Sequence, residues 1–248
     1  MNPTVASARL HVRLLAAWSI LFVLTGWAPK DRFTWALEAA PAVAAVIAIA
    51  ALYRRWRFTP LVLVLVLAHC VVLMIGARYT YAEVPWFNLL RDEFGLARNY
   101  YDRVGHFAQG FVPAMVAREI LLRNGVLPRG RWLFFLVACT CLAISASYEF
   151  VEWWVALASG EAAEAFLGAQ GDVWDTQWDM FLALCGAVVA QVLLGRFHDR
   201  QLGLAGPLPE VKLREIDASN IDEVADIRVG PSQSRLVASV GKTLWQAG

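Results

Sequence analysis

The stretch FTPLVLVLVLAHCVVLMIGA (residues 58–77) decides the fold, because it contains no Asp, Glu, Lys or Arg. As an α-helix it would be about 30 Å long, which matches the hydrocarbon layer of a bilayer. The rest of the chain has the same character: 58% of its 248 residues are hydrophobic and only 17% are charged, and the mean hydropathy is +0.50. A soluble domain carries about 25% charged residues, so the composition indicates an integral membrane protein.

Five further apolar stretches of similar length accompany this one. Trp and Tyr side chains gather at their ends, as in the interfacial belts of membrane proteins. The first stretch follows basic residues, as a secretion signal does, but it lacks a small-x-small cleavage site, so we expect the chain to retain it. We therefore predict an all-α membrane protein in which residues 1–206 form a bundle of six transmembrane helices. The predicted spans are residues 14–29, 33–53, 58–77, 104–122, 132–158 and 178–195.

The distribution of Lys and Arg predicts the orientation, because short loops rich in these residues stay in the cytoplasm. Arg54, Arg55 and Arg57 crowd the loop after the second span, whereas residues 159–177 contain no basic residue and four acidic ones. The sequence thus predicts a bacterial inner-membrane protein with both termini in the cytoplasm. The acidic loop then faces outward.

The net charge and the cysteines exclude other classes of protein. A net charge of +1 gives no basic excess for binding nucleic acid, so the expected partner is the lipid bilayer itself. All four cysteines lie in apolar stretches, where a thiol packs as a small hydrophobic group. We expect no structural disulfide.

Polar residues from separate spans fall at one depth near the outer surface. If the fifth span enters the hydrocarbon near Trp132, Glu149 lies about 26 Å and Glu152 about 30 Å further along the helix. On the fourth span, which runs inward from Tyr101, His106 lies about 8–9 Å below the same surface. A carboxylate at a helix centre costs about 2.5–3.5 kcal/mol, so such groups usually face protein or a polar cavity.

The spacing of these residues predicts which of them share a helix face. Residues three or four apart lie on one side of a helix, so each of the last three spans presents one polar stripe. Facing stripes would surround an outward-opening pocket that suits Mg²⁺, Mn²⁺ or Zn²⁺, or that supplies a general acid and base. The stripes are Asp102, His106, Gln109 and Pro113; Ser145, Glu149 and Glu152; and Asp172, Asp175 and Asp179. We predict Glu149, His106, Glu152 and Asp102 as catalytic residues, and Asp172, Asp175 and Asp179, with His106 and Glu149, as ligands of a divalent metal ion.

Simpler interpretations of these residues stay open. Asp102 with the adjacent Arg103, and the aspartates at the start of the last span, would also serve as interfacial charges or partners of a helix dipole. His106 alone would be explained equally well by one structural hydrogen bond. Arg118 and Glu119, near the inner end of the fourth span, are expected to pair or to extend toward the interface.

The long loop before the fourth span contains an amphipathic segment. Residues 86–94 place Trp86, Phe87, Leu90 and Phe94 on one side, which predicts a short helix at the outer interface. Such a helix is either a lid over the pocket or a surface anchor, and we favour the anchor.

Three blocks of sequence resemble the YjdF family of bacterial inner-membrane proteins. They are FNLLRDEFGLARNYYDRVGHFAQGF (residues 87–111), YEFVEWW (residues 148–154) and LGAQGDVWDTQWDMF (residues 167–181). The resemblance extends over residues 10–202. It implies a membrane location and topology, and it supplies no reaction.

A looser resemblance is to VanZ-like proteins, which are associated with glycopeptide resistance at the cell envelope. The shared order is Asp102-Arg103-x-x-His106-Phe107, then a membrane glutamate, then two aspartates spaced D-x-x-x-D at the start of a glycine-containing last span. The VanZ pattern includes an arginine-rich turn, where this sequence has acidic residues instead.

The composition changes after Gly206. Residues 207–248 read as a soluble C-terminal tail on the cytoplasmic side, and we expect it to be short and poorly ordered. Within it, VKLREI (residues 211–216) is typical of a strand, and Ser219 with Asp222 forms a capping-box pattern before a short helix. The run from 211 to 247 resembles the opening of a GNAT acetyltransferase without the later turn that binds acetyl-CoA. About 40 residues cannot form an acyltransferase core.

Two functions of different classes remain for the predicted pocket. In the first, it is a metal-assisted or acid–base enzyme site acting on a lipid-linked envelope substrate that arrives from the outer leaflet. In the second, the same carboxylates carry cations or protons through a transporter. A structural or partner-binding role is a third alternative. An enzyme needs a cavity that is closed on its cytoplasmic side, whereas a transporter needs polar groups that continue to the inner face. Beyond Arg118 and Glu119, the sequence offers few polar residues near that face. This shortage favours the enzyme.

Overall fold

The computed structural model describes residues 3–159 and 169–204 of the chain, and these residues form α-helices and no strands. The chain divides into two units, Met1–Gly206 and Pro207–Gly248. The strand and helix predicted in the tail lie outside the described residues, as does the part of the acidic loop that contains Glu161 and Glu164. The predicted all-α class is confirmed.

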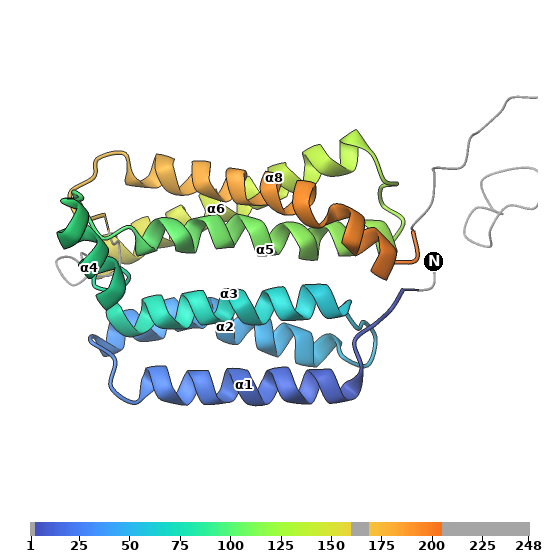
Figure 1. Cartoon of the computed structure of the whole chain (residues 1–248), viewed down its shortest axis with the longest axis horizontal. Helices are drawn as coiled ribbons and strands as arrows, with labels where there is room; N and C mark the ends of the chain where they lie inside the picture. Colours follow the sequence, from blue (N-terminus) through green and yellow to red (C-terminus); the bar gives the residue numbers. More distant parts are fainter. Residues whose placement is uncertain (1–2, 160–168, 205–248) are drawn as a thin grey trace, which may run out of the picture. The chain divides into compact units, whose positions relative to one another are not determined.

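The described part of the first unit contains seven helices. Figure 1 shows α1, α2 and α3 grouped in the lower half of the view and α5, α6 and α8 in the upper half, with the short α4 across one end. Contacts between α3 and α5 join the two groups. The helices are α1 (Ala8–Gly26), α2 (Arg32–Leu52), α3 (Pro60–Tyr79), α4 (Pro85–Phe94), α5 (Tyr101–Arg123), α6 (Arg131–Ser159) and α8 (Asp175–Gln201).

Local chemistry explains where several helices begin and end. Asp31 caps α2 by accepting a hydrogen bond of 2.6 Å from the backbone N–H of Thr34, and this bond holds the pKa of the Asp31 carboxyl below its usual range. Thr59 caps α3, whose first residue is Pro60, a position where the missing N–H costs nothing. The amphipathic segment predicted at 86–94 is α4, and Gly95 ends it in the left-handed conformation.

Two glycines allow α5 and α8 to pack backbone against backbone. A Cβ atom added to Gly110 would overlap the carbonyl oxygen of Ala183, and one added to Gly186 would overlap that of Phe107. Small residues at such crossings are typical of membrane helices, because lipid supplies no hydrophobic force to hold two helices together. This close contact fixes the register between the polar stripes of α5 and α8.

Five of the described helices are long and apolar enough to cross a membrane: α1, α2, α3, α6 and α8. The sixth expected span, α5, has 23 residues but is more polar than the other five, because it carries charged residues at both ends. It lies between α3 and α8 (Figure 1), the place that a sixth span would occupy. The first span differs from its expected bounds of 14–29, since α1 ends at Gly26.

Candidate functional site

The N-terminal end of α5 brings four polar side chains together, those of Arg98, Asp102, Arg103 and His106. Arg98, just before the helix, lies 3.4 Å from the Asp102 carboxylate, four residues on. Asp102 also approaches His106, with 3.4 Å between Oδ1 and Nε2. Arg103 lies between them in sequence and points toward α8, where its Nη1 contacts the backbone carbonyl of Asp175. Asp102 and His106 therefore lie on one face of α5, as the spacing predicts.

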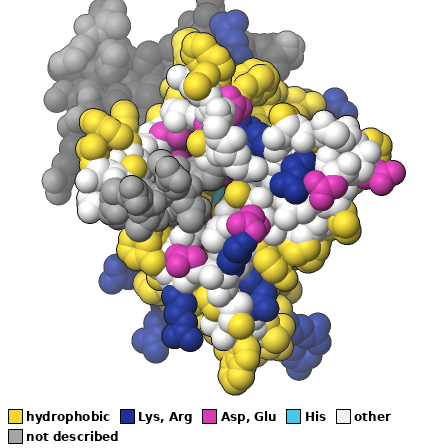
Figure 2. Space-filling model, turned by 90° about the vertical axis from the view of Figure 1, so that its left-hand side faces the viewer, with side chains coloured by type: hydrophobic (Ala, Val, Ile, Leu, Met, Phe, Trp, Pro, Cys, Tyr) yellow, Lys and Arg dark blue, Asp and Glu magenta, His cyan; other side chains and the backbone are white. Residues whose placement is uncertain are grey.

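The start of α8 and the turn before it supply three aspartates that pair with the two arginines. Arg98 lies 2.5 Å from Asp175, and Arg103 lies 2.9 Å from Asp172 and 2.7 Å from Asp175. Arg103 also forms an ion pair with Asp179. Figure 2, which looks onto this end of the molecule, shows Asp and Glu side chains interspersed with Lys and Arg. These aspartates are thus partners of guanidinium groups.

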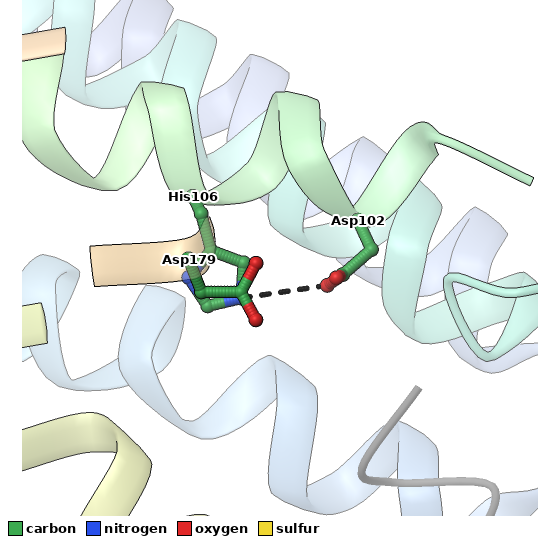
Figure 3. Close-up of side chains that lie close together, drawn as sticks. All are labelled: Asp102, His106 and Asp179. Atoms are coloured by element: carbon green, nitrogen blue, oxygen red, sulfur yellow. Dashed lines mark ion pairs between the residues drawn. The ribbon is translucent and has the colours of Figure 1, made fainter. Parts of the chain in front are cut away.

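His106 lies at the centre of the cluster and is 8% exposed. In Figure 3, Asp102 stands one helical turn away on α5, and Asp179 of α8 lies beside the ring, with 3.7 Å between Oδ2 and Nε2. The other ring nitrogen, Nδ1, is 3.0 Å from Gln109 Oε1. Both ring nitrogens therefore have polar neighbours that orient the imidazole. The interpretation of His106 by one structural hydrogen bond would account for only one of these neighbours.

Glu149 and Glu152 reach the same point from α6. One ligand atom each of His106, Glu149 and Glu152 lie within 4.8 Å of one another, as do those of Asp102, His106 and Asp179. Glu149 is 8% and Glu152 is 9% exposed. The structure thus brings together all four residues predicted as catalytic, and it places Asp179 among them. Asp172 and Asp175 belong instead to the arginine network beside this group.

Glu38 of α2 is a member of the site that the sequence analysis missed. Its side chain is 6% exposed and lies 3.4 Å from the hydroxyl of Tyr148, which donates a hydrogen bond to it. The depth argument applied to His106 would have found it, because Glu38 lies about 9 Å along α2 from Arg32. The pairing of Arg98 and Arg103 with Asp175 and Asp172 was missed as well, because it joins residues that lie 77 and 69 positions apart in the sequence.

A cavity of about 460 Å³ extends from this cluster into the bundle. Polar side chains line one end: Glu38, His69, Asp102, His106, Tyr148 and Glu152. Apart from Gln109 and Thr140, apolar side chains line the rest, among them Val112, Pro113, Val116, Ala117, Ile120 and Ile144. The cavity is therefore amphipathic, with its carboxylates and imidazole at one end.

A second buried polar cluster lies at the other end of α5. Glu119 is fully buried and accepts hydrogen bonds from the Thr59 hydroxyl at 2.7 Å and from Arg123 at 2.7 Å, and it lies 3.1 Å from His198. Arg118, which is 7% exposed, pairs with Asp199 at 2.7 Å. Of the two expectations for Arg118 and Glu119, pairing is correct and extension to the interface is not, because α8 supplies partners inside the protein.

The two arginines do not offset all of the negative charge at the candidate site. Two guanidinium groups face four aspartates, and the buried Glu38, Glu149 and Glu152 add three further carboxylates. In the described residues, Glu149 and Glu152 form no salt bridge with Lys or Arg. Buried carboxylates of this kind either bind a proton or hold a cation, so the site is equipped for proton transfer or for metal binding.

Comparison with known proteins supports one of the resemblances seen in the sequence. Residues 10–200 match the model of a family described as predicted membrane protein (DUF2238). The chain is 50% identical over 185 residues to the inner membrane protein YjdF of Escherichia coli (strain K12), an alignment that covers 74% of this chain and 88% of that protein. No solved structure matches the chain.

The other two resemblances, to VanZ-like proteins and to the opening of a GNAT acetyltransferase, find no support in these comparisons. The family match ends at residue 200 and so leaves out the tail. The chain therefore belongs to the DUF2238 family of predicted membrane proteins, as a multi-pass protein of the inner membrane.

Proposed function

We propose that this protein is a membrane-embedded enzyme that performs acid–base chemistry on the polar head of a lipid-linked substrate. The observation that carries the proposal is the amphipathic cavity, in which a buried carboxylate and imidazole cluster closes one end of an apolar chamber. Its volume of about 460 Å³ lies within the range of small-molecule sites, about 300–1,000 Å³. An amphiphile fits this distribution: its chain lies among apolar side chains and its head meets Asp102, His106 and Glu152.

The chemical roles follow from the different surroundings of the acidic groups. Glu149 and Glu152 lie three residues apart on one face of α6, close to each other and to His106. Two crowded carboxylates without an arginine partner share a proton, so that one acts as acid and the other as base. Asp102 and Gln109 hold the His106 ring in place. The substrate head would lie between α5 and α6.

A lateral route into the cavity supports a lipid substrate. Ile120 and Ile144 line the apolar end and are 40% and 42% exposed, so this end reaches the side surface of the bundle between α5 and α6. A lipid chain can enter there without crossing water.

The inner end of the cavity argues against a continuous path for ions. Below His106, the lining residues contributed by α5 after Gln109 are apolar. The buried charges of Arg118, Glu119 and His198 lie near the inner end of the bundle and are not among the lining residues. A transporter would need polar groups along this stretch, and the enzyme requires none.

The test is to fill the apolar chamber. Val116→Trp should displace the lipid that copurifies with the protein and should abolish any phenotype that the intact gene confers. The matched control is Val192→Trp on α8, where the native side chain is 66% exposed; it should retain both. Lipid content is measured by extraction and mass spectrometry of the purified protein.

An unchanged lipid content in Val116→Trp would contradict the proposal. Proton or cation uptake by proteoliposomes that contain the wild-type protein would favour the transporter instead.

A further inference from the structure

The charges of the candidate site separate into a compensated and an uncompensated half. Arg98 and Arg103 pair with Asp102, Asp172, Asp175 and Asp179 at the junction of α5 and α8. Glu149 and Glu152 lie on the α6 side and form no salt bridge with an arginine or lysine of the described chain. The segment 160–168 that follows α6 contains no Lys or Arg either, so it cannot supply the missing charge.

Glu149 shows most clearly that a partner is needed. It is 8% exposed, and its Oε1 atom is buried without a hydrogen-bond partner in the described structure. Leaving a buried charged oxygen unsatisfied costs at least about 1–3 kcal/mol. The carboxylate faces the Glu152 carboxylate and the His106 ring, neither of which removes that cost while both glutamates are ionised.

The geometry of these three side chains suits one metal ion. Their ligand atoms lie within 4.8 Å of one another, and the ligands of a tetrahedral ion with bonds of about 2.1 Å are about 3.4 Å apart. A shift of each side chain by less than about 1 Å closes the difference. Gln109 contacts Nδ1 of His106, as second-shell groups do when they orient a metal-bound imidazole.

A second group, Asp102, His106 and Asp179, has similar spacing but is a poorer site. Asp102 pairs with Arg98 and Asp179 with Arg103, so each carboxylate would have to release a guanidinium group before it could bind an ion. Two fixed positive charges beside the site would also repel a cation.

We infer that His106, Glu149 and Glu152 form a binding site for one divalent transition-metal ion, Zn²⁺ or Mn²⁺, at the polar end of the cavity. One imidazole and two carboxylates form a donor set that these ions accept. The ion offsets the charge of the two glutamates, and its remaining positions face the cavity. The inference deepens the proposed function, since an ion here would polarise the head of the substrate.

The test measures metal binding directly on the purified full-length protein in detergent. The protein is stripped with EDTA, equilibrated with ZnCl₂ or MnCl₂ and separated from free metal, and its metal content is determined by mass spectrometry. We expect about one ion per chain. The double variant Glu149→Gln/Glu152→Gln and the single variant His106→Asn should each bind at least about tenfold more weakly, the loss expected when a ligand is removed.

Two further variants make the test specific. Glu93→Gln, an exposed position on α4, should bind as the wild type does. Asp179→Asn should also keep the ion, because Asp179 is a partner of Arg103. If Asp179→Asn loses the ion while the double glutamate variant keeps it, the ion binds to Asp102, His106 and Asp179 instead. That result would overturn the inference. If a variant misfolds, X-ray absorption at the zinc edge of the wild-type protein still tests the site. The spectrum should show one imidazole and oxygen ligands around the ion, and any other set of protein ligands would overturn the inference.

The outcomes also separate this inference from the proposed function. A wild-type protein that binds neither ion overturns the metal site. If Val116→Trp nevertheless displaces copurified lipid, the enzyme proposal stands with acid–base chemistry alone. If the ion binds and no lipid is displaced, the metal site stands and the lipid substrate is wrong.

Discussion

At the scale of single residues, two buried glutamates illustrate opposite uses of charge. Glu119 is satisfied by Thr59, Arg123 and His198, whereas Glu149 keeps an oxygen without a partner. A carboxylate with a full set of partners stabilises the fold, because removing its charge leaves those partners buried and uncompensated. A buried carboxylate oxygen that lacks a partner among the described residues, such as Oε1 of Glu149, raises the free energy of the folded protein, and a ligand or substrate can remove that cost.

This contrast predicts that the same substitution has opposite effects at the two positions. Glu119→Gln should lower the free energy of unfolding by about 3–5 kcal/mol, the usual cost of breaking a buried ion pair. Glu149→Gln should leave it unchanged or raise it, yet abolish the phenotype of the intact gene. Both are measured by thermal unfolding of EDTA-treated protein in the same detergent. Strong destabilisation by Glu149→Gln, or a phenotype that survives it, would assign Glu149 a structural role.

At the scale of helices, the crossing of α5 and α8 positions the site. The close approach at Gly110 and Gly186 lets Arg103 reach the aspartates of α8, and α6 packs against both helices. We predict that Gly110→Ala lowers the free energy of unfolding by about 1–3 kcal/mol, because the added methyl group overlaps the Ala183 carbonyl and must push the helices apart.

Gly195→Ala on α8 is the matched control for that prediction. A Cβ atom there meets open space, so the substitution should be neutral or stabilise the helix by up to about 1 kcal/mol. The two variants are compared by unfolding in detergent. Equal effects at both positions would show that the glycines matter for helix propensity rather than for the crossing.

At the scale of the whole molecule, one end of the described bundle carries the candidate site and the other carries the Glu119 cluster. Near the Glu119 cluster, the backbone N–H of Thr4 bonds the carbonyl of Gln201 at the end of α8, so the N-terminal segment and the end of the last helix lie on the same side. The abundance of arginine in the loop after α2 predicts that this side is cytoplasmic.

Cysteine labelling tests the orientation. In a background where the four native cysteines are replaced by alanine, Ala163→Cys in the acidic loop should react with a membrane-impermeant maleimide in intact spheroplasts. The control is Val126→Cys in the loop between α5 and α6, where the native side chain is 60% exposed. This cysteine should react only after lysis. The reverse pattern would invert the topology and place the candidate site in the cytoplasmic half.

The sequence by itself determined the helices and the depth of the polar groups, because both depend on local properties of the chain. An apolar run such as residues 58–77 forms a helix in lipid whatever its neighbours are, since its backbone has no other hydrogen-bonding partner there. The rise per residue then places His106, Glu149 and Glu152 at one level, and helical spacing gives each stripe a face.

Only the tertiary structure decided which of these charges have partners. Asp172 and Asp175 look like metal ligands by spacing, but Arg98 and Arg103 reach them across the contact between α5 and α8. Glu38 joins the site from α2, more than 60 residues away in sequence from His106. The role of a buried carboxylate depends on the charge beside it, and in this protein that charge comes from another part of the chain. The approach of α5 to α8 is set by the contacts of Gly110 and Gly186. No local sequence pattern encodes those contacts.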